Sequence, residues 1–256
     1  MFDIIGFKAL RKERGTSGLH QLFERGINPA IQHSAAGRSK SVMTAAGHTQ
    51  LEPDFHEQSV KYLAVSDTVI FISRDDSFNS FLNMVHSAFM LLQFGFSGSK
   101  APYRGAIGWG DLISDASGII LGNAVEDAYD GERSQAWAGC MLTNNCESFA
   151  SQNGYIEEFR TPHLMLSRAD TDEVTRRKNL ENANRLVRYP VPKYRNPKEG
   201  PVAYSNVEAY AIDWTIRMYE GAAAKSLAPS NDKHAQLISQ NTVKFENWAR
   251  KNNRAI

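Results

Sequence analysis

The chain has 256 residues, a formal net charge of +1 and 42% hydrophobic residues. This length fits one large domain or a domain with appendages. The balanced charge excludes bulk electrostatic attraction to nucleic acid or to a membrane surface. The spacing of Cys140 and Cys146 is not that of a zinc site, and two cysteines cannot form a disulfide scaffold. No apolar run reaches the ~18–20 residues that span a bilayer, and the acidic start is unlike a signal peptide. We therefore expect a cytoplasmic protein with reduced thiols.

The first half of the chain predicts alternating strands and helices. The expected elements are a strand at 2–7, a helix at 9–32 broken near Gly15 and Gly18, a loop at 34–54, strands at 60–66 and 68–73 that meet at Ser66-Asp67, and a helix after the cap Asp75-Asp76-Ser77. The last helix is the clearest, because apolar residues from Phe78 to Leu92 repeat at helical spacing.

The second half predicts further strands and helices. We expect a strand pair at 103–109 and 113–121 with its turn at 114–118, a helix at 123–138, an extended segment at 154–165, a polar helix at 170–186, strands at 187–194 and 203–214, and an amphipathic helix at 232–251. The order β-α-β-β-α-β with later additions predicts an α/β (α+β) fold with a split, ferredoxin-like sheet covered by helices.

Two aspartates stand at the edges of apolar, β-branched runs. Asp3 lies in Phe2–Lys8, and Asp67 lies in Lys61–Ser73. A lone buried carboxylate is costly, and two carboxylates on neighbouring strands repel each other. A divalent cation is the usual remedy, and Mg²⁺ and Mn²⁺ prefer such oxygen ligands. The pattern favours a divalent-cation site, although a surface Asp3 and a simple turn Asp67 remain an open alternative.

Four motifs occur in the order seen in class III nucleotidyl cyclases. That family opens with F-D-I-x-G-F, then has a G-D hairpin, an R-x-G/A-I-x-x-G strand and a G-x-x-V-x-x-A helix. The matching segments are Phe2–Phe7, Ser66-Asp67, Tyr103–Gly110 and Gly122–Tyr129, with further similarity at Tyr189–Lys193 and Asp213-Trp214. The chain is most similar to the bacterial pyrimidine cyclases of the Pycsar antiphage system. The resemblance implies a cyclase domain over residues 1–220 and a C-terminal helical extension at 221–256.

The resemblance also implies a metal and phosphate site at the N-terminus. Asp3 and Asp67 would bind two divalent cations, Mg²⁺ or Mn²⁺, with the carbonyl of Ile4 as a further ligand. In such enzymes the cations bridge the triphosphate, activate the ribose 3′-hydroxyl and stabilise the leaving pyrophosphate. Backbone N–H groups at the start of the next helix would bind phosphates, namely those of Gly6, Phe7 and Lys8. An ordinary turn glycine at position 6 is compatible with that role.

The positions that select the base depart from the purine enzymes. Adenylyl cyclases carry a lysine four residues before the hairpin aspartate and an aspartate three residues before the helix-opening glycine. Here those positions are Leu63 and Ile119. Neither side chain can hydrogen-bond an adenine edge, so we expect discrimination against adenine. Tyr62 and Arg104 are the polar candidates for a pyrimidine contact. A plain sheet tyrosine and a structural ion-pair arginine are the respective alternatives.

The predicted helix at 123–138 departs from the family as well. Purine cyclases place an asparagine there and, four residues later, an arginine, where this chain has Glu126 and Asp130. Carboxylates that face a triphosphate repel it in the absence of a metal or a proton. Arg133, one turn further on, or Arg104 would then supply the positive charge. Lys193 is a candidate phosphate contact, with a solvated strand-end lysine as the alternative.

The resemblance implies a homodimer whose two sites each take aspartates from one protomer and helix residues from the other. The expected reaction converts UTP, or CTP, into the 3′,5′-cyclic monophosphate and pyrophosphate. The product would act on a separate cyclic-nucleotide-binding effector in defence against phage. Two alternatives stay open: a purine cyclase with unusual base contacts, and an inactive cyclase-fold module that binds nucleotide and regulates. Intact Asp3 and Asp67 argue against the second alternative, and the missing helix arginine argues for it.

Overall fold

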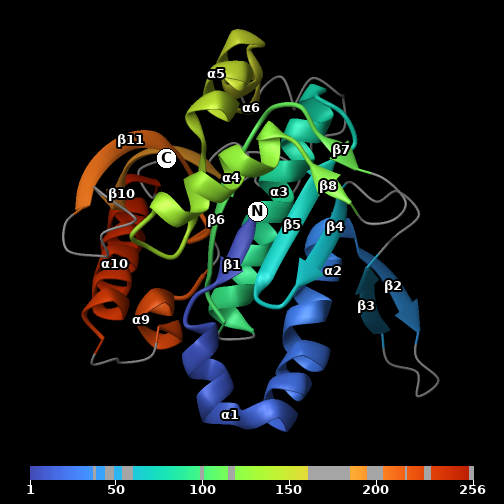
Figure 1. Cartoon of the computed structure of the whole chain (residues 1–256), viewed down its shortest axis with the longest axis vertical. Helices are drawn as coiled ribbons and strands as arrows, with labels where there is room; N and C mark the ends of the chain where they lie inside the picture. Colours follow the sequence, from blue (N-terminus) through green and yellow to red (C-terminus); the bar gives the residue numbers. More distant parts are fainter. Residues whose placement is uncertain are drawn as a thin grey trace.

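A seven-stranded sheet forms the centre of the molecule (Figure 1). The computed structural model describes residues 1–36, 39–43, 49–53, 60–98, 101–114, 119–160, 185–194, 204–216, 218–227 and 232–253. Across the sheet the strands are β10 (Leu186–Tyr194), β11 (Tyr204–Ile212), β9 (Cys140–Leu142), β6 (Tyr103–Ile107), β1 (Phe2–Ile4), β5 (Thr68–Ser73) and β4 (Val60–Val65). Neighbouring strands are antiparallel except for the parallel pair of β6 and β9. The predicted α+β class is thus confirmed.

The half of the sheet that carries the candidate site consists of β6, β1, β5 and β4. Along the chain these are the fourth, first, third and second strands of the group. Their side chains alternate between the two faces, as the strand period requires. Phe2, Val69 and Tyr103 lie in the buried core, whereas Asp3 and Arg104 point to the opposite face.

Helices cover the core face of this half. The chain leaves β1 through α1 (Phe7–Leu22), a π-helical turn η1 (Phe23–Ile27) and α2 (Asn28–Ala36). The predicted interruption lies at Gly15, whose φ is 65°, and Gly18 is helical. After the hairpin of β4 and β5, Ser77 caps α3 (Phe78–Ser97), since its hydroxyl accepts a hydrogen bond from the Ser80 N–H at 3.3 Å.

The opposite face carries α4 (Asn123–Ser134), which packs over β6. The close approach requires glycine at the end of β6. A Cβ on Gly108 would lie 2.8 Å from the Ala124 carbonyl oxygen and 2.8 Å from the Ala128 nitrogen. A Cβ on Gly131 would lie 2.9 Å from the Cβ of Ala106. Both glycines therefore allow α4 to rest directly on the sheet.

Two strand predictions were wrong. Part of the segment 34–54, predicted as a loop, forms a hairpin of β2 (Ser39–Met43) and β3 (Thr49–Pro53). The predicted partners 103–109 and 113–121 do not pair with each other. Instead β6 pairs with β1 and β9, so both of its hydrogen-bonding edges are occupied. The second segment folds on itself as the small hairpin of β7 (Ile113–Ser114) and β8 (Ile120–Leu121).

The helix predicted at 123–138 ends early, because Gln135 is extended (φ −84°, ψ 139°) and bridges to Lys193. The short β9 and the helix α5 (Asn144–Gln152), which follow, were not predicted. The segment predicted as extended at 154–165 is helical in α6 (Tyr155–Arg160), where the Tyr155 ring packs 5.6 Å from that of Phe78. Residues 161–165 and the predicted polar helix up to 184 lie outside the described residues.

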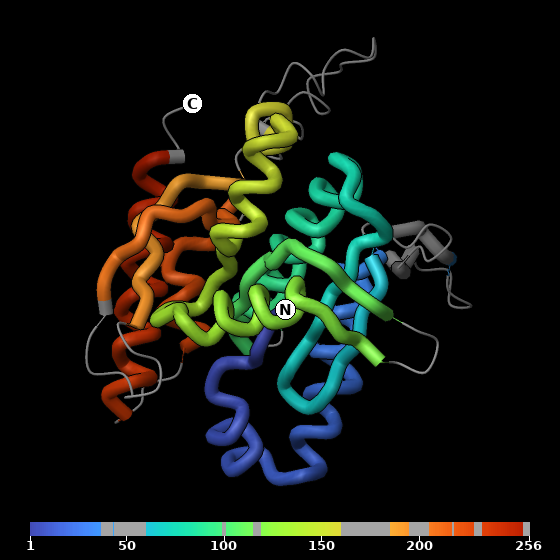
Figure 2. Tube along the Cα trace, turned by 45° about the horizontal axis from the view of Figure 1, so that its top comes forward, coloured from blue at the N-terminus to red at the C-terminus, as the bar shows by residue number. Residues whose placement is uncertain are grey.

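The C-terminal segments pack against the far end of the sheet (Figure 2). The hairpin of β10 and β11 is confirmed, and α9 (Ala222–Ser226) and α10 (Lys233–Asn253) follow. The Phe245 ring of α10 is fully buried, 4.5 Å from that of Trp137 and 4.8 Å from that of Tyr189. The described residues of the segment 221–256 therefore contribute to the main hydrophobic core. Within the described part of the chain, no helix is both long and apolar enough to cross a membrane.

Candidate active site

Of the two sequence-predicted aspartates, Asp3 lies on β1 and Asp67 lies in the turn that joins β4 to β5, the neighbour of β1. Asp3 is the register partner of Thr68 on β5, and the Ile4 N–H donates to the Asp67 carbonyl at 3.0 Å. Ser66 makes the tight turn possible by adopting a left-handed φ of 57°. The structure therefore brings Asp3, Ile4 and Asp67 together, as the resemblance implied. The Ile4 side chain is buried in the core, so only its backbone could reach a metal.

The Asp3 carboxyl lies in an unusual electrostatic setting. Burial, and then the negative charges of Glu132 and Asp67, raise its pKa to about 7, although the positive charge of Arg104 lowers it. Among the described residues, neither Asp3 nor Asp67 has a side-chain hydrogen bond or an ion pair. Two adjacent half-buried carboxylates without an ion pair suit a cation, which would favour their charged forms.

The cation site would be incomplete with protein ligands alone. Over the described ranges, no group of three or more His, Cys, Asp or Glu side chains could hold a metal ion. Mg²⁺ is commonly bound by one or two carboxylates, and substrate phosphates and water complete its octahedron. The donor set of Asp3 and Asp67 fits that mode of binding, in which the substrate brings the remaining oxygens.

The segment after β1 offers backbone donors close to the aspartates. Gly6 adopts a left-handed φ of 75°, and α1 begins at Phe7 without a side-chain cap. Phe7 packs inward, its ring 6.0 Å from that of Phe23, whereas Lys8 is exposed. The first N–H groups of a helix have no intrahelical acceptor, so this terminus can receive an anion. The phosphate contacts of Gly6, Phe7 and Lys8 stay a prediction.

Arg104 lies directly opposite Asp3 in the register of β6 and β1, yet it is bound elsewhere. Its Nε donates to Glu132 Oε1 at 2.5 Å, and its Nη1 donates to the Gln135 carbonyl at 3.2 Å. Glu132 belongs to α4 and is almost fully buried. The Gln135 amide in turn donates to the Gly105 carbonyl at 2.7 Å. Arg104 is thus a structural ion-pair partner beside the candidate site, and any contact with a base remains a prediction.

The predicted residues of α4 project away from the sheet. Glu126 and Arg133 are exposed, two turns apart on the outer side of the helix. Arg133 Nη1 donates to the Tyr129 hydroxyl at 2.6 Å, and its guanidinium lies 5.2 Å from the centroid of that ring. Within the described chain, no interaction joins Glu126 or Arg133 to the aspartate pair. The structure therefore does not bring these two residues into one site with Asp3 in a single protomer.

Lys193 lies at the end of β10 and is half-buried. Burial lowers the pKa of its ammonium group, and the nearby charges of Asp127 and Glu147 raise it. These two acids belong to α4 and α5. The structure thus surrounds Lys193 with the carboxylates of the α4–α5 region rather than with Asp3 and Asp67. Its predicted phosphate contact stays a prediction for a site that includes another chain.

The predicted base-selecting positions lie on the open face and at its edge. Tyr62 is exposed on the edge strand β4, and Leu63 is the register partner of Ile70. Ile119 precedes β8 and is half exposed. None of these three is among the described residues that line the cavity between β5 and α4. Leu63 nevertheless neighbours that cavity, because Ile70 forms part of its wall.

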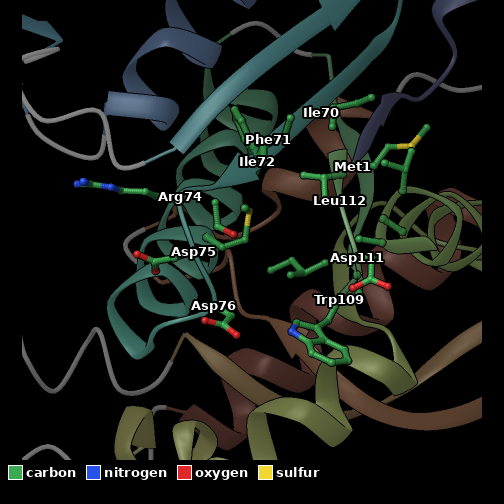
Figure 3. Close-up of a pocket in the computed structure, with 18 residues that line it drawn as sticks. Met1, Ile70, Phe71, Ile72, Arg74, Asp75, Asp76, Trp109, Asp111 and Leu112 are labelled. Atoms are coloured by element: carbon green, nitrogen blue, oxygen red, sulfur yellow. The ribbon is translucent and has the colours of Figure 1, made fainter. Parts of the chain in front are cut away.

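This cavity, of about 390 Å³, opens between β5, the connection that follows β6, and the start of α4 (Figure 3). Met1 forms one wall, two residues before Asp3 and on the same face of β1. The Trp109 ring, 43% exposed, stacks on Phe149 at 4.4 Å, and its indole nitrogen faces the side where Asp76 lies. Trp109 and Asp111 also line this cavity and were not among the predicted site residues. The sequence Trp-Gly-Asp directly after a strand was a signal that could have indicated them.

Comparisons with protein-family models, with curated proteins and with solved structures found no match to this chain.

Proposed function

We propose that the protein is a pyrimidine nucleotide cyclase, which converts UTP or CTP to the 3′,5′-cyclic monophosphate and pyrophosphate. One observation carries the proposal. Asp3 on β1 and Asp67 in the adjacent turn lie next to each other, and among the described residues neither side chain has a hydrogen bond or an ion pair. A structural role does not account for this pair, because unpaired, half-buried carboxylates oppose folding. A role in binding cations and a triphosphate does account for it.

The strand order supports the same proposal. The order fourth, first, third, second in β6, β1, β5 and β4, with helices in both crossovers, matches the split β-α-β-β-α-β arrangement. The ferredoxin-like catalytic fold of class III cyclases uses this arrangement, and the motifs with Asp3 and Asp67 occupy equivalent strands. This likeness of fold is an analogy, so the weight of the proposal rests on the site.

The residues of the chain have distinct roles in the proposed reaction. Asp3, Asp67 and the Ile4 carbonyl would hold two divalent cations, which when bound neutralise the triphosphate and acidify the 3′-hydroxyl. The first turn of α1 after Gly6 binds phosphate oxygens through its N–H groups. The 3′-oxygen forms a bond to the α-phosphorus, the bond from that phosphorus to the bridging oxygen breaks, and pyrophosphate leaves. The 3′-hydroxyl proton passes to solvent.

The chemistry of the open face favours a pyrimidine. Leu63 and Ile119 offer no hydrogen bond to an adenine edge, and a purine site without such groups gains little from its base. The apolar wall of the neighbouring cavity, with Ile70 and Val125, suits the flat face of a smaller ring. We place UTP before CTP as the substrate, with the cyclic product acting as a messenger on a separate effector.

The proposed enzyme is a homodimer. Large apolar side chains on β4 and on the β7–β8 hairpin are open to solvent, with 60% of Val65, 68% of Ile113 and 59% of Leu121 exposed. A second copy that packs against these side chains would bury them. Glu126 and Arg133, which do not contact the aspartates of their own chain, would then act in the site of the partner.

One observation favours a second candidate, a nucleotide-binding regulatory module without cyclase activity. Both arginines predicted to face the triphosphate are occupied, Arg104 by Glu132 and Arg133 by Tyr129. A site without a free arginine stabilises the transition state less well. Binding of nucleotide and cations through Asp3 and Asp67 would still be possible.

Incubation of the purified protein with Mn²⁺ and equimolar ATP, GTP, UTP and CTP tests the proposal. We expect cyclic UMP or cyclic CMP as the main product, together with one pyrophosphate for each turnover. Cyclic AMP or cyclic GMP as the main product would contradict the choice of base. Saturable nucleotide binding without any cyclic product would favour the regulatory module.

A further inference from the structure

Asp3 and Arg104 are cross-strand neighbours that do not pair. They are register partners on β1 and β6 and point to the same face of the sheet. Opposite charges at such positions normally attract and stabilise a sheet. The ion pair of Arg104, however, is with Glu132 on α4, with Nε 2.5 Å from the carboxylate oxygen. Asp3 is left with its carboxylate free among the described residues.

We propose that Glu132 is a positioning residue that keeps Arg104 away from Asp3 and so leaves the Asp3 carboxylate available to a divalent cation. The inference rests on the proposed cation site. It goes beyond that proposal because it assigns a role to a buried acid that lies outside the predicted site residues.

The geometry of the arginine supports this role. Arg104 is held at two points of its guanidinium, by the Glu132 carboxylate and by the Gln135 carbonyl at 3.2 Å. Gln135 is fixed in turn, because its amide donates to the Gly105 and Gly131 carbonyls and its oxygen accepts from the Trp137 indole at 2.7 Å. A planar guanidinium bound at two points loses its freedom to turn toward another acid.

The charges around Asp3 agree with the assignment. Arg104 is the register partner of Asp3, yet its guanidinium is directed to the Glu132 carboxylate. If Arg104 turned to Asp3, it would neutralise the carboxylate and compete directly with a cation. Glu132 is 3% exposed, and Asp3 is the register partner of Arg104, so an arginine released from Glu132 would have the Asp3 carboxyl beside it.

Two variants of Glu132 distinguish its contact with Arg104 from the effect of its negative charge on Asp3. Glu132→Asp keeps the charge, but its side chain is one methylene shorter and cannot hold Arg104 Nε. Glu132→Met loses both the charge and the contact. Mn²⁺ affinity is measured on the full chain by electron paramagnetic resonance of free Mn²⁺. It should fall ~10-fold or more in both variants, because an opposite charge close to a carboxyl group lowers the pKa of that group by about 1–3. If Glu132 acted through its charge alone, Glu132→Asp would retain the parent affinity, and that result would overturn the inference.

The chain offers a matched control. Glu246 and Arg250 form a second buried pair at 2.9 Å, on α10 and away from Asp3. Glu246→Asp likewise shortens the side chain of the acid by one methylene, and it should leave the Mn²⁺ affinity unchanged. An equal loss in this control would mean that the effect reports general destabilisation and would contradict the assignment.

A second measurement needs no variant. The Arg104 Nε–H of the parent protein should give a slowly exchanging proton signal in nuclear magnetic resonance, both with and without saturating Mg²⁺. A rapidly exchanging Nε–H would show that Glu132 does not hold the arginine and would refute the inference. If the parent protein bound no divalent cation, the proposed cation site would fail and the inference with it. Parent binding with an unchanged Glu132→Asp affinity would refute the inference alone.

Discussion

Asp3 links the stability of the fold to pH. Its pKa is about 7 in the folded protein and has an ordinary value of 3.8. Because the folded state binds this proton more tightly than the unfolded chain, the free energy of unfolding falls as the pH rises through that interval. Above about pH 7 the carboxylate is charged in both states, and its full destabilising effect is present.

We expect Asp3→Asn to remove this dependence. In the absence of divalent cations, the variant should melt at a higher temperature than the parent at pH 8, and at nearly the same temperature at pH 4. Each kcal/mol gained corresponds to a rise of about 2–4 °C for a chain of this size. Thermal melts at the two pH values are the measurement. A variant less stable than the parent at pH 8 would show that the charged carboxylate has a stabilising partner.

The sequence allowed the aspartates to be predicted, but not their surroundings. An acid at the edge of an apolar strand is visible in the chain itself, and so is the turn at Ser66-Asp67. The partner of Arg104 was not visible, because Glu132 comes from a helix that begins after the β7–β8 hairpin and packs over β6. The place of Trp109 in the cavity wall depends on the same docking of α4.

At the scale of elements, the sequence predicted those with a clear local pattern. It did not predict elements that are very short or whose position depends on pairing with a distant strand. The hairpin of β4 and β5 and the helix α3 follow from alternation and helical periodicity over six to twenty residues. β9 has only three residues, all of them buried, so it shows no alternation. Its position is set by parallel pairing with β6 rather than by its own residues. α5 depends on a cap, since the Thr143 hydroxyl accepts from the Cys146 N–H at 3.2 Å.

The C-terminal helix provides a test at this scale. Phe245→Ala in α10 would leave a cavity against the rings of Trp137 and Tyr189 and should lower the free energy of unfolding by about 3–5 kcal/mol. Asn247→Ala, an exposed position on the same helix, is the matched control and should change it little. Urea denaturation followed by tryptophan fluorescence measures both. A Phe245→Ala midpoint equal to that of the control would show that α10 is not part of the cooperative core.

At the scale of the whole molecule, the proposed dimer predicts complementation. Asp3→Ala should inactivate one half of each site, and a variant with Glu126→Ala and Arg133→Ala the other half. A mixed dimer has one site with every lesion and one with none. Because random exchange gives mixed dimers about half of the time, activity should return to roughly a quarter of the parent level. Subunit exchange is verified with tagged chains. No recovery would mean that the site lies within one chain or excludes the α4 residues.

The most direct test of the central claim is the cyclase activity of Asp67→Asn. The substitution keeps the size of the side chain and removes one carboxylate of the pair, so the charge of the triphosphate is no longer neutralised. Glu13→Gln, an exposed acid on α1, is the control for the change in net charge. With UTP or CTP and Mn²⁺, we predict a folded Asp67→Asn protein that forms no cyclic product, and a Glu13→Gln protein with the parent rate. Cyclic product from Asp67→Asn at the parent rate would contradict the account.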